Sequence, residues 1–486
     1  MPNSPSADPA PAVADADDAS LWSPSRRTLT IGLVLTVTIV ASEALAVSTI
    51  MPLVASDLRA SPDLYGWVFS GFFLGSLLGI VVAGLMIDRG GLVRPFVVGL
   101  GLFSAGLLVG GLAPTMEVLI GGRVLQGLGA GAIPAISYVS IGRALPERLR
   151  PRMFAILSTA WVIPGVIGPN VASLVAETLH WRLVFLGLLP LIGVAAALTL
   201  PAIAGVRSAE GAANAEHEVA LDARRRLPLA VALVAGAGLA VAGLSGIGPA
   251  PLIAIVAGVA SGGLAFRRLT PPGTLTARGR MPSAIAMRGL LTFAFFCADA
   301  YVPFAFQQVR GTDTLIGGLA YTAATLSWTS GSWIQAHRIE RYGLRAFTTA
   351  GFVTLIVGIA GFALVLSPDV PLVVGVLAWT VAGFGMGLSY STFSLVVLRE
   401  AVESEQGLAT AGLQLSDVLG TSLGTGVGGA LIALGIRLGE PVWTGFAAAF
   451  AASVVVGLVG LALTPRLAPS RRDERRNQPI LGRSPG

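Results

Sequence analysis

The sequence predicts an all-α polytopic membrane protein, and three observations support this prediction. The 486 residues are 54% hydrophobic and only 12% charged, with a mean hydropathy of +0.78, which is more apolar surface than a soluble core can hide. Apolar runs longer than about 18 residues follow one another along most of the chain. A short signature also occurs twice, at a fixed offset of 252 residues, with a long apolar segment on each side of both copies. One structural unit is therefore expected to occur twice.

Fourteen transmembrane helices are expected, because fourteen segments are each long enough to cross ~30 Å of hydrocarbon. They cover residues 29–52, 64–87, 95–113, 117–142, 153–176, 183–204, 228–246, 249–266, 283–308, 314–336, 346–366, 370–398, 407–434 and 442–464. All 32 basic residues are Arg, and with a cytoplasmic N-terminus 27 of them fall in cytoplasmic loops, tails or segment edges and four fall outside. The positive-inside rule favours this orientation, and an even number of spans returns the C-terminus to the cytoplasm.

These segments divide into two pseudo-symmetric six-helix bundles with a central two-helix hairpin. The expected parts are a disordered cytoplasmic tail (1–27), an N-terminal six-helix bundle (28–205), a cytoplasmic linker (206–227), two extra transmembrane helices (228–267), a cytoplasmic loop (268–282), a C-terminal six-helix bundle (283–465) and a cytoplasmic tail (466–486). The two extra helices are expected to lie at the periphery of the bundles.

Composition and residue spacing exclude several kinds of site. The net charge of +6 needs no nucleic acid to explain it, because positive charge on cytoplasmic loops is how such proteins set their topology. Cys297 is the sole cysteine and lies in an apolar segment, which excludes disulfides and Cys-based metal sites. His180, His217 and His337 are too scattered to hold a metal. No metal, cofactor or nucleic-acid partner is expected.

The repeated signature follows the second predicted span and occurs again between the tenth and eleventh. Its residues are Gly84, Asp88, Arg89, Gly91 and Arg94 in the first copy, and Glu340, Arg341 and Gly343 in the second. Glycines allow a tight turn, and a carboxylate beside an Arg can contact the positive end of a neighbouring helix. A solvated turn with an ion pair is the alternative interpretation.

Together with the six-plus-six layout, the first copy resembles the Gly-x3-Asp-Arg-x-Gly pattern of the major facilitator superfamily. The resemblance is specifically to the fourteen-span drug:proton antiporter branch, and it covers nearly the whole chain outside the tails. Leu92 and Val93 stand where the family usually has basic residues, which weakens the basic cluster here. The resemblance implies that both copies of the signature help to close a cytoplasmic gate.

A second motif lies in the fourth predicted span. The run Arg123-Val124-Leu125-Gln126-Gly127-Leu128-Gly129 is similar to the Arg-x-x-Gln-Gly-x-Gly pattern of the same family. Arg123 lies about two turns into the membrane, where a charge costs roughly 2.5–3.5 kcal/mol on insertion scales. It should therefore face a cavity or a carboxylate, unless it snorkels to the outer interface. The resemblance implies a role in proton exchange or substrate binding.

A third motif, in the fifth span, contains Pro164, Gly168 and Pro169. It resembles the antiporter pattern Gly-x3-Gly-Pro-x-x-Gly-Gly, with Pro164 in place of the first glycine. Proline removes a backbone hydrogen bond and small neighbours allow close helix packing, so this helix is expected to bend. The family associates the motif with exporters, although a Gly-Pro kink by itself occurs in membrane helices of every function.

Three acids lie well inside apolar spans and are candidates for proton coupling, together with Arg123. They are Glu43 in the first span, Asp299 in the ninth and Asp417 in the thirteenth. Burial favours the neutral form of a carboxyl group and a nearby guanidinium favours the charged form, so a moving cation could release the proton. A hydrogen bond to a neighbouring helix is the alternative role for each acid.

Several polar and aromatic residues within the spans could line a substrate cavity. They are Gln126, Trp161, Asn170, Tyr301, Gln307, Trp328, Tyr390 and Gln414. An acid among aromatic rings, as around Asp299, suits lipophilic cations as well as protons. Each of these residues alone is equally consistent with helix packing.

The family resemblance implies a monomeric, proton-coupled antiporter in the cytoplasmic membrane of a bacterium, exporting small hydrophobic or amphiphilic compounds. Its partners would be that substrate, protons and the lipid bilayer, with the proton gradient as energy source. A lipid or metabolite carrier, which could be an importer, is an alternative within the class, and a non-transporting receptor or scaffold is one outside it. An intramembrane enzyme would need convergent catalytic groups, such as Ser with His, and the sequence offers none.

Overall fold

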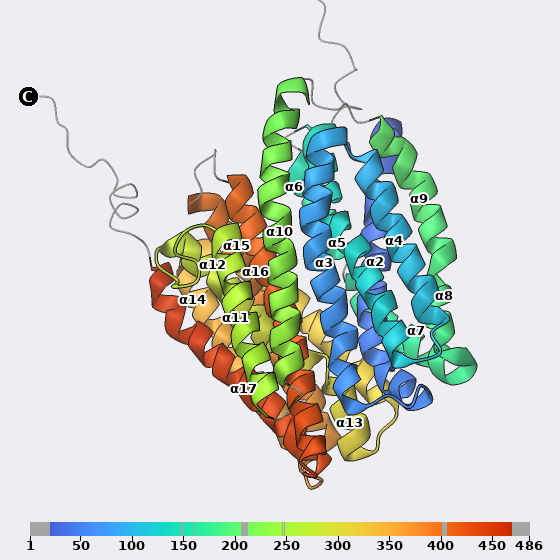
Figure 1. The fold of residues 1–486 in the computed structure, drawn as a ribbon, viewed down its shortest axis with the longest axis vertical. Helices are drawn as coiled ribbons and strands as arrows, with labels where there is room; N and C mark the ends of the chain where they lie inside the picture. Colours follow the sequence, from blue (N-terminus) through green and yellow to red (C-terminus); the bar gives the residue numbers. More distant parts are fainter. Residues whose placement is uncertain are drawn as a thin grey trace, which may run out of the picture.

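The computed structural model describes residues 20–146, 149–160, 162–205, 212–244, 246, 248–400 and 406–468. Nearly all of these residues are helical, and most of the helices run along the long axis of the molecule (Figure 1). Within this described part, 12 helices are long and apolar enough to cross a membrane. The prediction of an all-helical, multi-pass membrane protein is confirmed, with twelve helices meeting this criterion where fourteen spans were predicted.

The helices up to residue 204 pack on one another and lie on the right in Figure 1. They are α2 (Pro24–Asp57), α3 (Pro62–Gly90), α4 (Val93–Gly111), α5 (Met116–Ala144), α6 (Arg150–Thr159), α7 (Val162–Val175), α8 (Arg182–Leu186) and α9 (Leu188–Ala204). α2 packs against α7 and α9, and α5 packs against both α3 and α4.

The later helices form a second group, which lies mainly on the left in Figure 1. They are α10 (Ala212–Leu244), α11 (Pro249–Leu269), α12 (Arg280–Asp299), α13 (Val302–Arg310), α14 (Thr314–Ala363), α15 (Leu372–Glu400), α16 (Gln406–Arg437) and α17 (Val442–Leu463). α12 packs against α15, α16 and α17, and α14 packs against α15 and α17. We call the side where α2 begins and α17 ends the termini side, and the opposite side the far side.

The two glycines shared by the repeated signature have the same unusual backbone. Gly91 ends α3 at φ 78° and ψ −162°, and Gly343 interrupts α14 at φ 80° and ψ 162°. Glycine adopts this conformation readily, whereas a side chain would strain it. Both copies therefore make the same sharp junction between two apolar helical segments, and α14 covers the predicted span 314–336 and most of the span 346–366.

Proline interrupts two of the predicted spans. The fifth is divided into α6 and α7, and the ninth into α12 and α13. A proline ring has no N–H and clashes with the carbonyl four residues earlier, which belongs to Ala160 for Pro164 and to Asp299 for Pro303. Each helix is interrupted at the position that its proline disfavours.

α10 is longer than the span that was predicted for it. It begins at Ala212, so the described part of the predicted linker 206–227 is helical rather than a loop, while residues 206–211 lie outside the described residues. α10 packs against α3 and α16 at once, and α11 packs on α10. Figure 1 shows α10 between α3 and α16, so this hairpin contacts both groups of helices.

A separate apolar cluster attaches the hairpin to both groups. Its buried members are Leu77 of α3, Leu233 of α10, Ala265, Phe266 and Leu269 of α11, and Leu415 of α16. We expect Leu233→Ala to destabilise the protein by about 2 kcal/mol or more, because Leu233 is 1% exposed and its loss leaves a cavity. The midpoint of thermal unfolding in detergent measures this effect. Leu252→Ala on the exposed face of α11 is the control, and an equal loss in both variants would contradict a structural role for the cluster.

α3 and α16 approach each other closely toward the far side. A Cβ atom added to Gly429 would lie 2.6 Å from Gly66 Cα, and the Ser70 hydroxyl donates to the Ser422 carbonyl at 3.0 Å. Small residues let helix backbones come this close inside a membrane. This contact, together with packing of α7 on α14, joins the two groups of helices.

Candidate functional site

Glu43 and Arg123 form an ion pair that is sealed within the spanning helices. Their side chains are 1% and 2% exposed, and Arg123 Nη1 donates to both Glu43 Oε1 and Gln126 Oε1, the latter at 2.7 Å. Arg123 Nε donates to the Val68 carbonyl at 3.2 Å, and the guanidinium carbon lies 4.3 Å from the centre of the Phe72 ring. Arg123 therefore faces a carboxylate and does not snorkel to an interface.

Two buried polar atoms in this cluster have no hydrogen-bond partner among the described residues. They are Glu43 Oε2 and Gln126 Nε2. Buried polar groups are nearly always satisfied in folded proteins, so this acceptor and donor mark a place where a proton or a polar group can bind. A proton on Oε2 would neutralise Glu43 without breaking the bond between Oε1 and Arg123.

Asp299 is buried without an ion pair. It is 8% exposed, and its carboxylate has no hydrogen bond or ion pair with any other described residue. Its backbone carbonyl, which Pro303 deprives of a helical partner, accepts the Tyr321 hydroxyl at 2.5 Å. A charged carboxylate in such a place is costly unless a proton or a cation neutralises it. Asp299 can therefore exchange a proton for a cation without leaving a buried positive side chain unpaired.

Sequence reasoning missed a second buried arginine. Arg288 lies near the start of the predicted span 283–308, where positive charge usually anchors topology, but it is 3% exposed and pairs with Asp417. The bonds are Nε to Oδ1 at 3.0 Å and Nη2 to Oδ2 at 3.2 Å. The Tyr390 hydroxyl donates to Asp417 Oδ2 at 2.8 Å. The only signal in the sequence was Asp417 itself, because a buried carboxylate requires a buried donor.

Aromatic rings extend from this second pair. The Tyr390 ring centre lies 5.4 Å from Trp328, Trp328 lies 5.6 Å from Phe295, and Phe295 stacks on Trp379 at 5.1 Å. Tyr390 and Trp328 are half-buried and so keep part of their surface accessible. We call Tyr390, Trp328 and Phe295 the aromatic wall. It offers flat apolar surface next to a charged pair, which suits an amphiphilic ligand.

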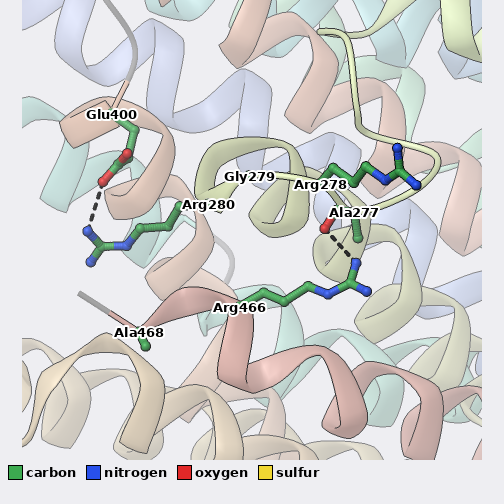
Figure 2. Close-up of a pocket in the computed structure, with 7 residues that line it drawn as sticks. All are labelled: Ala277, Arg278, Gly279, Arg280, Glu400, Arg466 and Ala468. Carbon is green, nitrogen blue, oxygen red and sulfur yellow. Dashed lines mark hydrogen bonds and ion pairs between the residues drawn. The ribbon is translucent and has the colours of Figure 1, made fainter. Parts of the chain in front are cut away.

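A cavity of about 560 Å³ lies on the termini side, away from these clusters. Figure 2 shows that its arginines diverge: Arg280 points to Glu400, with the paired atoms 2.8 Å apart, while Arg278 points away from them. Arg466 donates to the Ala277 carbonyl at 2.6 Å and so holds the loop between α11 and α12. Since the charged groups do not converge, this cavity is not a candidate for the substrate site.

Most of the chain matches one known family of proteins. Residues 29–411, most of the chain, match the Major Facilitator Superfamily. The chain belongs to the major facilitator superfamily. It is therefore a multi-pass membrane transporter rather than an enzyme.

Similar proteins occur in bacteria. A probable multidrug-efflux transporter of Mycobacterium tuberculosis is 24% identical over 406 residues, which cover 80% of this chain and 84% of that protein. The multidrug transporter protein MdtP of Bacillus subtilis is 25% identical over 421 residues, 84% of this chain and 76% of its own. A solved POT family transporter in complex with 5-aminolevulinic acid has the same fold, with a TM-score of 0.67 at 12% identity, covering 93% of this chain and 99% of that one.

The structure describes only some of the side chains of the repeated signature. The side chains of Asp88 and Arg89 lie outside the described residues, and Arg94 is exposed. Glu340 and Arg341 are also exposed, and neither makes an ion pair with another described residue. A gating role for both copies stays a prediction, supported so far by the matching backbone of the two glycines. Gly84 contributes no close contact, since a Cβ placed there would meet no heavy atom within 4 Å.

The predicted cavity residues occupy different environments. Gln126 is bound to Arg123, and Asn170 donates to Thr322 of α14 at 3.0 Å. Tyr301 is fully buried and donates to the Thr425 carbonyl, which is a packing contact between helices rather than an open surface. Those that keep an accessible face are the half-buried Gln307, Trp328, Tyr390 and Gln414. Trp161 lies outside the described residues, and its prediction stays open.

The antiporter-like segment of the superfamily lies where α7 meets α2 and α14. A Cβ on Gly165 would collide with Thr325 of α14, and the atom nearest to a Cβ on Gly168 is the Ser42 carbonyl oxygen of α2, 4.0 Å away. The observed interruption precedes Pro164, whereas Pro169 lies inside α7. The predicted bend is therefore present as a helix break at the start of the motif.

Proposed function

We propose that this protein is a proton-coupled antiporter that exports small hydrophobic or amphiphilic compounds across the cytoplasmic membrane of a bacterium. The observation that carries the proposal is the set of buried carboxylates inside spanning helices: Glu43 and Asp417 are each paired with an arginine, and Asp299 has no partner among the described residues. The names of the relatives from M. tuberculosis and B. subtilis support drug-type substrates. The energy source would be the proton gradient, without a cofactor.

The proposed layout has fourteen spans. α14 supplies two of them on either side of Gly343, and α6 with α7 supplies another. They would form an N-terminal six-helix bundle, the α10–α11 hairpin and a C-terminal six-helix bundle, in a monomer. The termini side would be cytoplasmic, as the positive-inside rule favours.

In this orientation the structure would be closed toward the outside. The far-side contacts that support this are the approach of Gly66 to Gly429, the stacking of Tyr65 on Phe304 at 4.4 Å and the hydroxyl bond from Tyr301 to α16. Export by alternating access would require these contacts to open, so that the two bundles rock about a site at mid-membrane.

Proton exchange would use Glu43, Arg123, Asp299 and Asp417. A substrate cation would displace the proton from Asp299, and a proton entering from outside would displace the cation. The half-buried rings of the aromatic wall would select loosely for apolar, flat compounds, which is consistent with multidrug transport.

Uptake of ethidium into inside-out membrane vesicles tests the proposal. We expect acidification of the vesicle interior to drive ethidium uptake, and an uncoupler to abolish it, with vesicles lacking the protein as control. Glu43→Gln should lower uptake at least tenfold, because a neutral amide cannot exchange a proton. Uptake that persists with an uncoupler would contradict proton coupling. No ethidium uptake, with transport of a single lipid or metabolite class, would favour a dedicated carrier instead.

A further inference from the structure

The cluster around Arg288 repeats, in the second group of helices, the chemistry of the cluster around Arg123. Each contains one carboxylate, one arginine and one further polar side chain that bonds to the pair, namely Gln126 or Tyr390. Each arginine also lies against an aromatic ring, 4.3 Å from the centre of Phe72 or 3.0 Å from that of Tyr390. The arginine motif of the fourth span has no counterpart in sequence around Arg288, so this parallel exists only in three dimensions.

The carboxylate of the second cluster accepts more hydrogen bonds than that of the first. Both oxygens of Asp417 accept bonds from Arg288, and Oδ2 also accepts the Tyr390 hydroxyl. Arg288 Nη1 donates in turn to the backbone carbonyl of Tyr390. The Asp417 carbonyl accepts the Thr292 hydroxyl at 3.0 Å, so α12, α15 and α16 meet at this carboxylate.

Two features argue that this cluster does more than stabilise the fold. A buried ion pair seldom stabilises a protein more than an apolar pair of the same size, so its presence calls for another use. The Asp417 side chain also remains 13% exposed, compared with 3% for Arg288, which leaves the carboxylate open to a proton.

We propose that Arg288 is a positioning residue for proton exchange at Asp417, and that Tyr390 transmits this exchange to the aromatic wall. The inference rests on the proposed function. A proton that binds Asp417 makes the carboxyl neutral, and no other group gains or loses a proton. Arg288 then keeps its charge and its bond to the Tyr390 carbonyl but loses its anionic partner. The Tyr390 ring, whose hydroxyl bonds to Asp417 and whose face lies against the Arg288 guanidinium, is thereby freed to move against Trp328.

Among the described residues, Arg288 and Tyr390 are the side chains that bond to the Asp417 carboxylate. α12 contributes Arg288 and α15 contributes Tyr390, whereas α3, α10 and α17, which also pack on α16, place no ion-pair partner against Asp417 among the described residues. The nearby described side chains of α3 and α10 include the apolar Leu77 and Leu233. Among the described residues, Arg288 is therefore the charged group that pairs with Asp417.

A doubly neutral variant separates exchange from structure. Arg288→Gln or Asp417→Asn alone strands a buried charge, but the double variant Arg288→Gln/Asp417→Asn removes both charges and leaves polar groups that can still bond to each other. The matched control is Arg280→Gln/Glu400→Gln, which neutralises a more exposed pair that joins α12 to α15, whereas Arg288 and Asp417 join α12 to α16. Ethidium binding to the purified protein and uncoupler-sensitive ethidium uptake into inside-out vesicles are measured over a range of pH.

The inference requires that the double variant still binds ethidium but has an uncoupler-sensitive uptake at least tenfold lower than that of the wild type. The control variant should match the wild type in both measurements. Uptake by the double variant with an unchanged pH profile would overturn it. Absence of proton-driven uptake by the wild type would instead overturn the proposed function, and the inference with it.

Two milder variants decide the matter if the double variant does not fold. Tyr390→Phe keeps the ring but removes the hydroxyl that bonds to Asp417, and Arg288→Lys keeps the charge but not the two parallel bonds. The inference requires a displaced pH profile of uptake in Tyr390→Phe and partial activity in Arg288→Lys. Wild-type pH profiles in both would refute it.

Discussion

We expect replacement of Asp299 with Asn to abolish the proposed proton-driven export, while the protein still folds and reaches the membrane. The physical reason is the isolation of this carboxylate: it has no ion-pair partner among the described residues, so its neutralisation strands no opposite charge. The amide has the same shape, but it cannot hold an exchangeable proton or neutralise a cation. We expect ethidium uptake into inside-out vesicles to fall to the level of vesicles without the protein.

The matched control for this prediction is Asp313→Asn, an exposed acid at the start of α14. It should transport like the wild type, and both variants should be recovered from membranes in equal amounts. Normal uncoupler-sensitive uptake by Asp299→Asn would show that Asp299 has a structural role only. A loss of expression in Asp299→Asn would contradict the view that this carboxylate lacks a structural partner.

Gly429→Val should hold the far side apart and stop transport. A Cβ atom at this position would lie 2.6 Å from Gly66 Cα and 2.5 Å from the Tyr301 hydroxyl, so α3 and α16 must separate to accommodate it. Overpacking of this kind costs about 1–3 kcal/mol, enough to change the ratio of two conformations by about 5- to 150-fold. We expect the closed far side to be depleted and ethidium uptake to fall at least tenfold.

Spin labels test this change of conformation directly. Leu112 of the α4–α5 turn and Leu438 of the α16–α17 turn are exposed on the far side of the two groups of helices, and cysteines placed there can carry the labels after Cys297 is replaced by Ala. The distance between the labels should lengthen in Gly429→Val and stay the same in Gly101→Val, where a Cβ would meet no heavy atom within 4 Å. Unchanged distances in Gly429→Val would mean that this contact does not hold the far side closed.

Local chemistry explains why much of the helical layout could be predicted. Each spanning helix must satisfy its own backbone within the lipid, so a long apolar run is enough to locate it. Proline and glycine act through their own backbones, which is why the break before Pro164 and the junctions at Gly91 and Gly343 follow from their residue types. The break after Asp299 follows from Pro303 in the same way, although the sequence pattern alone had suggested one continuous span.

The partners of the buried charges depend on the tertiary structure. A charge at depth indicates that a partner is needed, and this reasoning led correctly from Arg123 to a carboxylate. It did not find Arg288, since an arginine near the end of a predicted span usually serves as a topology anchor. Asp417, which neutralises it, is 129 residues away.

By itself, then, the sequence determined that the protein is helical, crosses the membrane many times and contains a repeated unit, because hydropathy, proline and glycine act over a few residues. Only the tertiary structure decided which acids are paired, that α10 packs against both groups of helices, and that Tyr301 seals a helix contact. Those outcomes depend on which side chains meet across helices far apart in the chain. A buried charge in the sequence indicates that a partner of opposite charge is needed, but packing geometry decides which residue becomes that partner.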